Sequence, residues 1–226
     1  MVRFLRMVFE LIFLLLTCRE VIGVERAPRS GGCLLAVNHL SVIDLPFVFT
    51  AVHHQRMVAF VANKHRRNLL FRWVLNNAGV IWVRRREMDI GALKVALKAL
   101  QEGAMLGVAP EGTRSRNGQL QAAKPGIAFM AVRAGAPIVP VVVINTEGVF
   151  EAWKHLRRPR MTLKIGPPFT LAPLSAGDHS AQVREQTDEI MLRLAAMLPE
   201  PYRGVYRDHP RLPQFLEWAK EAGVQG

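Results

Sequence analysis

Short runs of apolar residues alternate along this chain with longer stretches in which apolar residues recur at every third or fourth position. The short runs are apolar at successive positions, which is typical of strands covered by helices on both faces. The predicted strands are residues 33–37, 57–62, 80–83, 105–109, 138–144 and 161–165. The predicted helices are residues 44–53, 69–77, 89–101, 125–133, 180–198 and 213–222. This alternation predicts an α/β fold with a mixed, largely parallel sheet flanked by helices.

The pattern of residues 1–18 is different, because two arginines lead into a run of apolar residues. A secretory signal peptide is disfavoured, since Glu10 interrupts the run, no small-x-small cleavage motif follows and Arg19 comes at once. The run is also shorter than the about 20 apolar residues that span a bilayer. We therefore predict a short apolar N-terminal helix that associates with an anionic membrane interface, because apolar residues cover nearly every face. The alternative is a core helix that packs on the domain.

Length and composition favour a single core, since 226 residues with 50% apolar content can bury one of ordinary size. We predict a membrane-associating segment over residues 1–29 and one core domain over residues 30–226 that includes the C-terminal helices. Cys18 and Cys33 lie in apolar sequence without the spacing of metal ligands. Both are predicted to be buried free thiols in a reducing compartment.

The net charge of +12 indicates an anionic partner. Nucleic acid, an anionic bilayer surface and a phosphorylated substrate all have the required charge. Nucleic acid is disfavoured, because its binding motifs are absent from the sequence and only 8% of the residues are aromatic. A membrane surface and a phosphorylated substrate remain.

A candidate catalytic pair, His39 and Asp44, follows the first predicted strand of the core. On a continuous helix two side chains five positions apart would diverge by roughly 140° beyond a full turn, so the pair needs a loop to meet. Asp is a favoured N-cap and Pro46 is tolerated only near a helix start, so we predict that a helix begins at Asp44 or Leu45. A carboxylate beside a histidine on a strand-end loop can fix its tautomer and raise its basicity. Taken alone, the pair is better explained as a helix cap beside an ordinary loop histidine.

Two further strand ends carry basic loops. Arg84, Arg85 and Arg86 follow the strand at 80–83, and residues 110–116 follow the strand at 105–109. The second loop holds a carboxylate, a glycine, two hydroxyls and two guanidinium groups. Glycine permits a close backbone approach, and arginine binds phosphate oxygens with two parallel hydrogen bonds. Each loop by itself is also compatible with a solvated charged turn.

A fourth feature is a stiff apolar segment at residues 137–140, in which two prolines frame two aliphatic side chains. Pro140 has no N–H group for a sheet ladder, so we predict that this strand begins irregularly or lies at a sheet edge. Packing alone would account for the segment.

Together and in this order, the four features resemble the motifs of the glycerolipid acyltransferase family. Asn38, His39 and Asp44 match its Asn-His-x4-Asp block, and residues 79–85 match an apolar strand that ends in arginine. Residues 110–115 match its Pro-Glu-Gly-Thr-Arg-Ser block, and residues 137–140 match its fourth block. The resemblance covers about residues 30–170. Two positions depart from the family pattern. Ala109 stands before the third block where phenylalanine is usual, and Arg84 stands where an acidic residue is common. These departures leave the identity of the acceptor open.

The resemblance implies an enzyme that transfers a fatty acyl group from acyl-coenzyme A or acyl carrier protein to the sn-2 hydroxyl of 1-acyl-glycerol-3-phosphate. His39 is expected to act as general base and Asp44 to support its imidazolium. The expected contacts of the glycerol phosphate are Arg85, Glu111, Gly112, Thr113, Arg114 and Ser115. The expected apolar wall consists of Pro137, Ile138, Val139 and Pro140.

No metal and no cofactor beyond the acyl thioester is expected. The expected partners are an anionic membrane surface, the lysophospholipid and the acyl donor, and the expected place is the cytoplasmic face of a membrane. Two alternatives remain open: an acyltransferase for another acceptor, such as glycerol 3-phosphate or another lysolipid, and a non-catalytic basic membrane-binding module.

Overall fold

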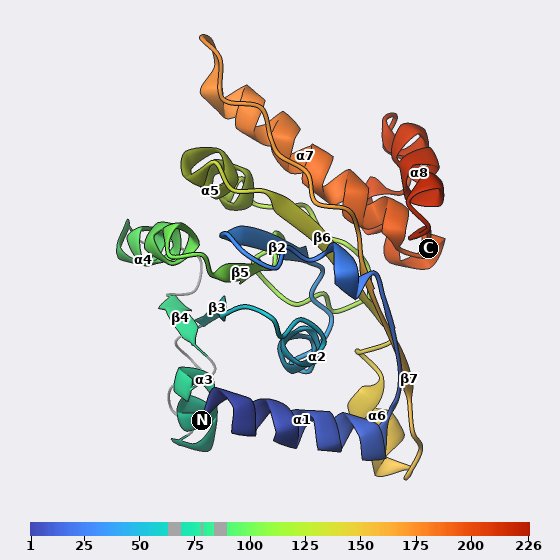
Figure 1. Cartoon of the computed structure of the whole chain (residues 1–226). Coiled ribbons are helices and arrows are strands. Elements are labelled where there is room, and N and C mark those ends of the chain that lie inside the picture. Colours follow the sequence, from blue (N-terminus) through green and yellow to red (C-terminus); the bar gives the residue numbers. More distant parts are fainter. Residues whose placement is uncertain (63–68, 78, 84–89) are drawn as a thin grey trace.

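The computed structural model describes residues 1–62, 69–77, 79–83 and 90–226. Within these ranges the chain forms a seven-stranded sheet with the order β1-β7-β6-β2-β5-β3-β4 (Figure 1). The strands are β1 Cys18–Ile22, β2 Cys33–Val37, β3 Met57–Ala62, β4 Val80–Val83, β5 Met105–Val108, β6 Ile138–Ile144 and β7 Arg160–Ile165. Neighbouring strands are parallel except for the antiparallel pair β6 and β7. The prediction of an α/β fold with a mixed, largely parallel sheet is therefore confirmed.

Helices cover both faces of the sheet (Figure 1). One face carries α1 Val2–Leu16, α2 Asp44–Ala51, α3 Leu69–Asn77 and α6 Val149–Lys154. The other face carries α4 Ile90–Gln101, α5 Gly126–Ala134, α7 His179–Met197 and α8 Leu212–Glu221. The described residues also form the 3-10 helices η1 Val24–Arg26, η3 Glu200–Tyr202 and η4 Gly204–Tyr206.

The sheet separates two apolar cores, and alternation along β2 shows the division. Leu34 and Ala36 face the core under α4, α5, α7 and α8, whereas Cys33, Leu35 and Val37 face the core under α1 and α2. Successive strand side chains point to opposite faces, so a strand covered on both sides must be apolar throughout. All five residues of β2 are buried, as the unbroken apolar run predicts.

One strand and one α-helix were not predicted from the sequence. Strand β1 pairs in parallel with β7, with Cys18 opposite Arg160, so the segment at residues 1–29 contributes an edge strand to the sheet. Helix α6 lies between β6 and β7. The position of β1 also shows that the predicted burial of Cys18 is wrong, because this residue is exposed at the sheet edge. Cys33 is buried as predicted, and burial raises the pKa of its thiol to about 12.

Of the two alternatives predicted for Pro140, the sheet edge is wrong, whereas an irregular start of the strand is found on its β7 side. Pro140 lies inside β6, which has β7 on one side and β2 on the other. The ladder to the β7 side is interrupted at this point. Ile138 pairs with Phe169 and Val141 pairs with Ile165. Pro140 therefore lies opposite the break at residues 166–168, where a missing N–H interrupts no regular ladder. The Pro140 carbonyl still accepts a hydrogen bond from the Gly166 N–H at 2.8 Å.

Helix α1 packs on the domain through one side only. Its buried residues are Leu5 and Phe13, and the Phe13 ring lies 5.7 Å from the ring of Phe47 in α2. Among the described residues, no helix is long and apolar enough to cross a bilayer. The contact with α2 agrees with the core-helix alternative, while most of the remaining apolar side chains of α1 are exposed.

Candidate active site

The turn between β2 and α2 brings His39 and Asp44 together. Nδ1 of His39 lies 2.8 Å from Oδ2 of Asp44. The same oxygen accepts hydrogen bonds from the N–H groups of Leu40 and Ser41, each at 2.7 Å. Helix α2 begins at Asp44, so the carboxylate does not cap the helix that it starts. It folds back over the preceding turn instead, and this fixes the loop that presents His39.

The second oxygen of the same carboxylate is also occupied. Thr146 follows β6, and its hydroxyl donates to Oδ1 of Asp44. Asp44 is 3% exposed and Thr146 is fully buried. Because a carboxylate only accepts hydrogen bonds, Asp44 selects the His39 tautomer with its proton on Nδ1. Nε2 is then the ring nitrogen available to a ligand.

Asn38 anchors the turn to the sheet. Its side-chain amide donates to the Val143 carbonyl at 2.9 Å, and its side-chain oxygen accepts from the Val143 N–H at 2.8 Å. Both polar groups of the buried amide are therefore satisfied by one residue of β6. The double contact locks the end of β2 against β6 directly before His39.

The loop after β5 holds the backbone of His39. Oε1 of Glu111 accepts from the His39 N–H at 3.3 Å, and the Ser115 N–H donates to the His39 carbonyl at 2.7 Å. Oε2 of Glu111 accepts from the Gln121 N–H at 3.0 Å. The structure thus brings Glu111 and Ser115 to the backbone of His39, whereas the sequence predicted contacts of these two residues with the glycerol phosphate.

Burial sets the acidity of Glu111, which is 4% exposed. Removal from water raises the pKa of this carboxyl to about 6, against the opposing effects of the hydrogen bonds from Gln121 and His39. A buried carboxyl with two backbone donors is well suited to hold a loop in place.

A cavity of about 370 Å³ opens beside His39. Its polar lining includes His39, Thr113, Arg114 and Lys124. Apolar side chains from α2, β3 and α5 form the walls, among them Leu45, Val48, Phe60, Val61, Ile127 and Met130. A pocket that is mostly apolar with a few convergent polar groups is the usual form of a small-molecule site.

Lys124 was missed by the sequence analysis. It lies beside Gly112, where a side chain would meet the Cδ and Cε atoms of Lys124 at 3.1 Å. Gly112 also has a φ of +68°, which residues with a Cβ rarely adopt. The Lys124 N–H also donates to the Pro110 carbonyl, which closes the loop. The sequence signal that could have identified Lys124 was a basic residue shortly after the 110–115 block.

Five further site residues were predicted from the sequence. Arg85 falls outside the described residues, as do its neighbours Arg84 and Arg86. Ile138, Val139 and Pro140 are buried within β6 and Pro137 directly precedes it. None of these four residues is among the side chains that line the cavity. The apolar lining comes from α2, β3 and α5 instead.

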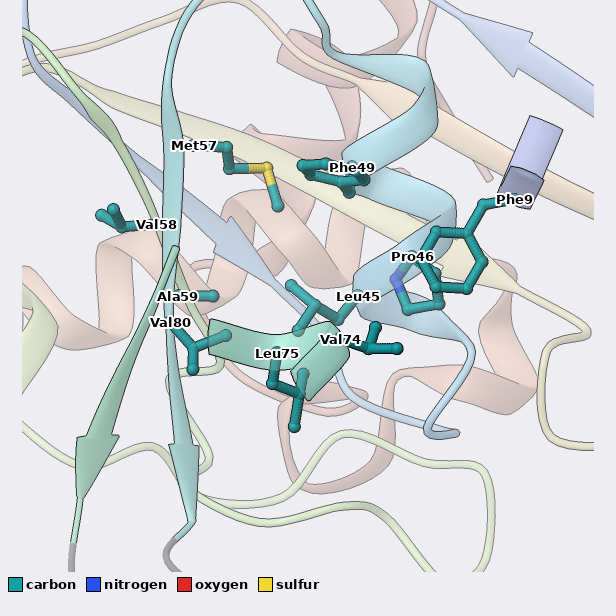
Figure 2. A pocket seen from close by; sticks show the side chains of 10 residues that line it. All are labelled: Phe9, Leu45, Pro46, Phe49, Met57, Val58, Ala59, Val74, Leu75 and Val80. Carbon is teal, nitrogen blue, oxygen red and sulfur yellow. The ribbon is translucent and has the colours of Figure 1, made fainter. Parts of the chain in front are cut away.

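A second, small apolar pocket adjoins the cavity (Figure 2). Its volume is about 40 Å³, and α1, α2, β3, α3 and β4 contribute its lining. Four residues line both spaces, namely Leu45, Met57, Ala59 and Leu75. Phe9 of α1 borders the small pocket only, on the side of Pro46 and Phe49 (Figure 2). The apolar lining beside His39 therefore continues toward the N-terminal helix.

The described part of the chain contains no group of three or more histidine, cysteine, aspartate or glutamate side chains arranged to hold a metal ion.

The chain is similar to known proteins in sequence and in fold. Residues 18–144 match the family model described as Acyltransferase. A 1-acyl-sn-glycerol-3-phosphate acyltransferase of Borreliella burgdorferi is 34% identical over 141 residues, which cover 58% of this chain and 52% of the relative. The human enzyme named 1-acyl-sn-glycerol-3-phosphate acyltransferase beta is 26% identical over 172 residues, covering 73% of this chain and 60% of the relative.

The alignments thus span little more than half the length of these relatives. The crystal structure of the 1-acyl-sn-glycerophosphate acyltransferase from Thermotoga maritima has the same fold, with a TM-score of 0.65 at 23% sequence identity. The superposition covers 84% of this chain and 76% of that protein.

Proposed function

We propose that this chain, which belongs to the Acyltransferase family, transfers a fatty acyl group from an acyl thioester to the sn-2 hydroxyl of 1-acyl-glycerol-3-phosphate, giving phosphatidic acid. The acceptor is suggested by the names of the relatives in Borreliella burgdorferi and in human. The observation that carries the chemistry is the imidazole of His39, oriented by Asp44 at 2.8 Å, in the lining of an apolar cavity.

The thioester already carries a good leaving group, so the reaction requires a general base for the alcohol. Nε2 of His39 takes the proton from the acceptor hydroxyl as its oxygen attacks the thioester carbonyl carbon. Asp44 stabilises the resulting imidazolium through Nδ1. The carbon–sulfur bond then breaks, and the thiolate leaves and takes the proton from the imidazolium. The proton thus passes from the hydroxyl through His39 to the thiolate, and the acyl group passes directly to the acceptor oxygen. The reaction requires no enzyme nucleophile, metal or prosthetic group.

The phosphate of the acceptor is assigned to the cationic side chains of the cavity lining. Arg114 and Lys124 line the cavity together with the hydroxyl-bearing Thr113, and neither cation forms an ion pair with another described side chain. Guanidinium and ammonium groups bind phosphate oxygens with strong, charge-assisted hydrogen bonds. Arg85 is assigned to the same phosphate from the sequence alone.

Membrane association is assigned to the free side of α1. Its exposed apolar residues recur at helical spacing along one face, and five of them are Phe4, Met7, Leu11, Leu14 and Leu15. Such a helix lies in a bilayer interface with its apolar face among the acyl chains. The net charge of +12 favours an anionic membrane, and we place the chain on the cytoplasmic face, where the thioester donors are found. The donor is acyl-coenzyme A or acyl carrier protein.

The test is release of free coenzyme A thiol by the purified protein from acyl-coenzyme A in the presence of 1-acyl-glycerol-3-phosphate. His39→Ala should lower kcat by a factor of about 10² to 10⁴, the usual contribution of a general base. The matched control is His179→Ala, because His179 is exposed at the start of α7 on the other face of the sheet. This variant should keep wild-type turnover.

Wild-type turnover by His39→Ala would overturn the base assignment. Thiol release with glycerol 3-phosphate but not with lysophosphatidate would leave the chemistry intact and reject the acceptor. Binding of anionic vesicles with no thiol release from any donor and acceptor pair would favour the non-catalytic membrane-binding alternative.

A further inference from the structure

The connection between α6 and β7 presents an unusual leucine. Leu156 is 95% exposed, and its φ is +54°. This left-handed conformation is unfavourable for a bulky side chain and is mostly adopted by glycine, asparagine or aspartate. Neither packing nor local backbone preference explains a leucine at this position, so its apolar side chain calls for another explanation.

The backbone around Leu156 is held firmly. The N–H groups of Leu156 and Arg157 donate to the carbonyls of Trp153 and Ala152 at 3.0 and 2.9 Å. The His155 N–H donates to the Ala152 carbonyl at 3.1 Å. The turn therefore closes tightly on the end of α6 and projects the Leu156 side chain away from the protein.

The turn is also tied to α1. The indole N–H of Trp153 donates to the Leu16 carbonyl at 2.8 Å. The guanidinium of Arg158 donates to the carbonyls of Leu14 and Thr17 at 2.7 and 2.9 Å. Figure 1 shows α6 beside the C-terminal end of α1. These bonds hold the turn that carries Leu156 against the C-terminal end of α1, the helix whose other side exposes apolar residues.

Positive charge surrounds the leucine. Exposed basic side chains occupy most positions from 154 to 160, namely Lys154, His155, Arg157, Arg158 and Arg160. The acidic partner near them is Glu151, which lies 2.8 Å from Nζ of Lys154. Among the described residues, Arg157, Arg158 and Arg160 have no acidic partner within ion-pair distance. A single apolar side chain within a group of cations complements an anionic bilayer, where headgroups bind the cations and acyl chains take the apolar group.

We propose that residues 154–160 form a second membrane-docking site, separate from α1, in which Leu156 inserts into an anionic bilayer and the surrounding basic side chains bind lipid phosphates. The connection leaves β6 at the same end of the sheet at which His39 follows β2. Docking at this point would extend the membrane contact of α1 beyond its C-terminal end. The proposal concerns binding alone, so it stands or falls independently of the acyl-transfer reaction.

The first test compares Leu156→Asn with wild type in a sedimentation assay. The vesicles contain phosphatidylcholine with or without phosphatidylglycerol, and no substrate is present. Asparagine adopts the left-handed region readily, so the variant should unfold at the same temperature as wild type or higher. Its affinity for the anionic vesicles should nevertheless fall by about tenfold or more, because the variant loses the burial of one leucine side chain in the bilayer.

Val205→Asn is the matched control. Val205 is 65% exposed and belongs to η4, which contacts α7 on the other face of the sheet. This change should leave vesicle binding unaltered. Equal binding by wild type and Leu156→Asn would overturn the proposal, and so would an equal loss in the two variants.

A spectroscopic test covers the case in which Leu156→Asn unfolds. A polarity-sensitive dye attached to cysteine in the double variant Cys18→Ser, Leu156→Cys reports the surroundings of position 156 directly. Its emission should shift to the blue with phosphatidylglycerol vesicles, with the shift reduced at high salt. An unchanged emission under conditions in which the protein sediments with the vesicles would exclude insertion at this position.

Discussion

At the scale of single residues, the position of the His39 ring depends on contacts made by its neighbours. Asp44 holds Nδ1, while Glu111 and Ser115 hold the backbone N–H and carbonyl of the same residue. Thr146 in turn holds Asp44. The ring is therefore fixed from two sides, and loosening either side should affect turnover more than folding.

Thr146 offers a direct test of this arrangement. Thr146→Val keeps the shape but removes the hydroxyl that donates to Asp44, so the carboxylate can rotate. We expect kcat to fall by about tenfold or more, with KM nearly unchanged, because the proposed base His39 would lose its orientation and small misplacements of a catalytic group are costly. Thr146→Ser keeps the hydroxyl and should recover most of the loss. Equal kcat values for the two variants in steady-state kinetics would show that the hydroxyl does not position Asp44.

Glu111 gives a prediction about pH. Its pKa is about 6 in the folded chain, above that of an unfolded glutamate, so the folded state binds the proton more tightly. The resulting stability is fully present below the unfolded pKa and is lost as pH rises through about 6. Lowering the pH from 7.5 to 4.5 should therefore stabilise wild type relative to Glu111→Gln by roughly 1 to 2 kcal/mol. Urea unfolding of both proteins at the two pH values measures the difference, and parallel pH dependences would contradict it.

Part of this candidate site could be identified from the sequence. The His39 and Asp44 pair was found because its two members are close in sequence and follow an apolar strand. Thr146 was not found, because its proximity to Asp44 depends on how β6 is placed next to β2. Such distances are properties of the folded chain and leave no spacing rule in the sequence.

At the scale of elements, the predictions were most reliable for strands that form an unbroken apolar run in the sequence. Strand β2 was predicted with its observed bounds, whereas β1 was missed. Only part of β1 faces the core, and its sequence mixes charged and apolar residues. An edge strand of this kind has no unbroken apolar run. Helix α6 spans six residues, too short for a helical period to repeat.

The two sides of α1 provide a matched pair of substitutions. Phe13 is 1% exposed against Phe47, so Phe13→Ala should destabilise the fold by about 3 to 5 kcal/mol. Leu11 is 55% exposed, so Leu11→Gln should leave the unfolding free energy nearly unchanged and weaken binding to anionic vesicles. Chemical unfolding and vesicle sedimentation of the two variants separate these effects. A stability loss in Leu11→Gln similar to that in Phe13→Ala would argue against a free apolar side.

At the scale of the whole molecule, the site lies where several chain segments meet at one end of the sheet. Strands β2, β5 and β6 are parallel neighbours, so the residues that follow them gather at a common edge. The alternation of strands and helices was enough to predict the fold class and that sites lie at strand ends. The strand order, with β2 between β5 and β6, could not be read from the sequence, because it depends on pairings between distant segments.

The direct succession of α1 and β1 has a consequence for how such a molecule would meet its substrates. Thr17 alone separates the two elements, and Arg19 of β1 forms an ion pair with Glu10 of α1. A protein resting on a bilayer through α1 could not swing on a flexible tether, and its height and tilt above the lipid plane would be set. Encounters would then depend on two-dimensional diffusion of lipids toward a stationary opening. Turnover should accordingly follow the surface density of the acceptor in the membrane rather than its bulk concentration.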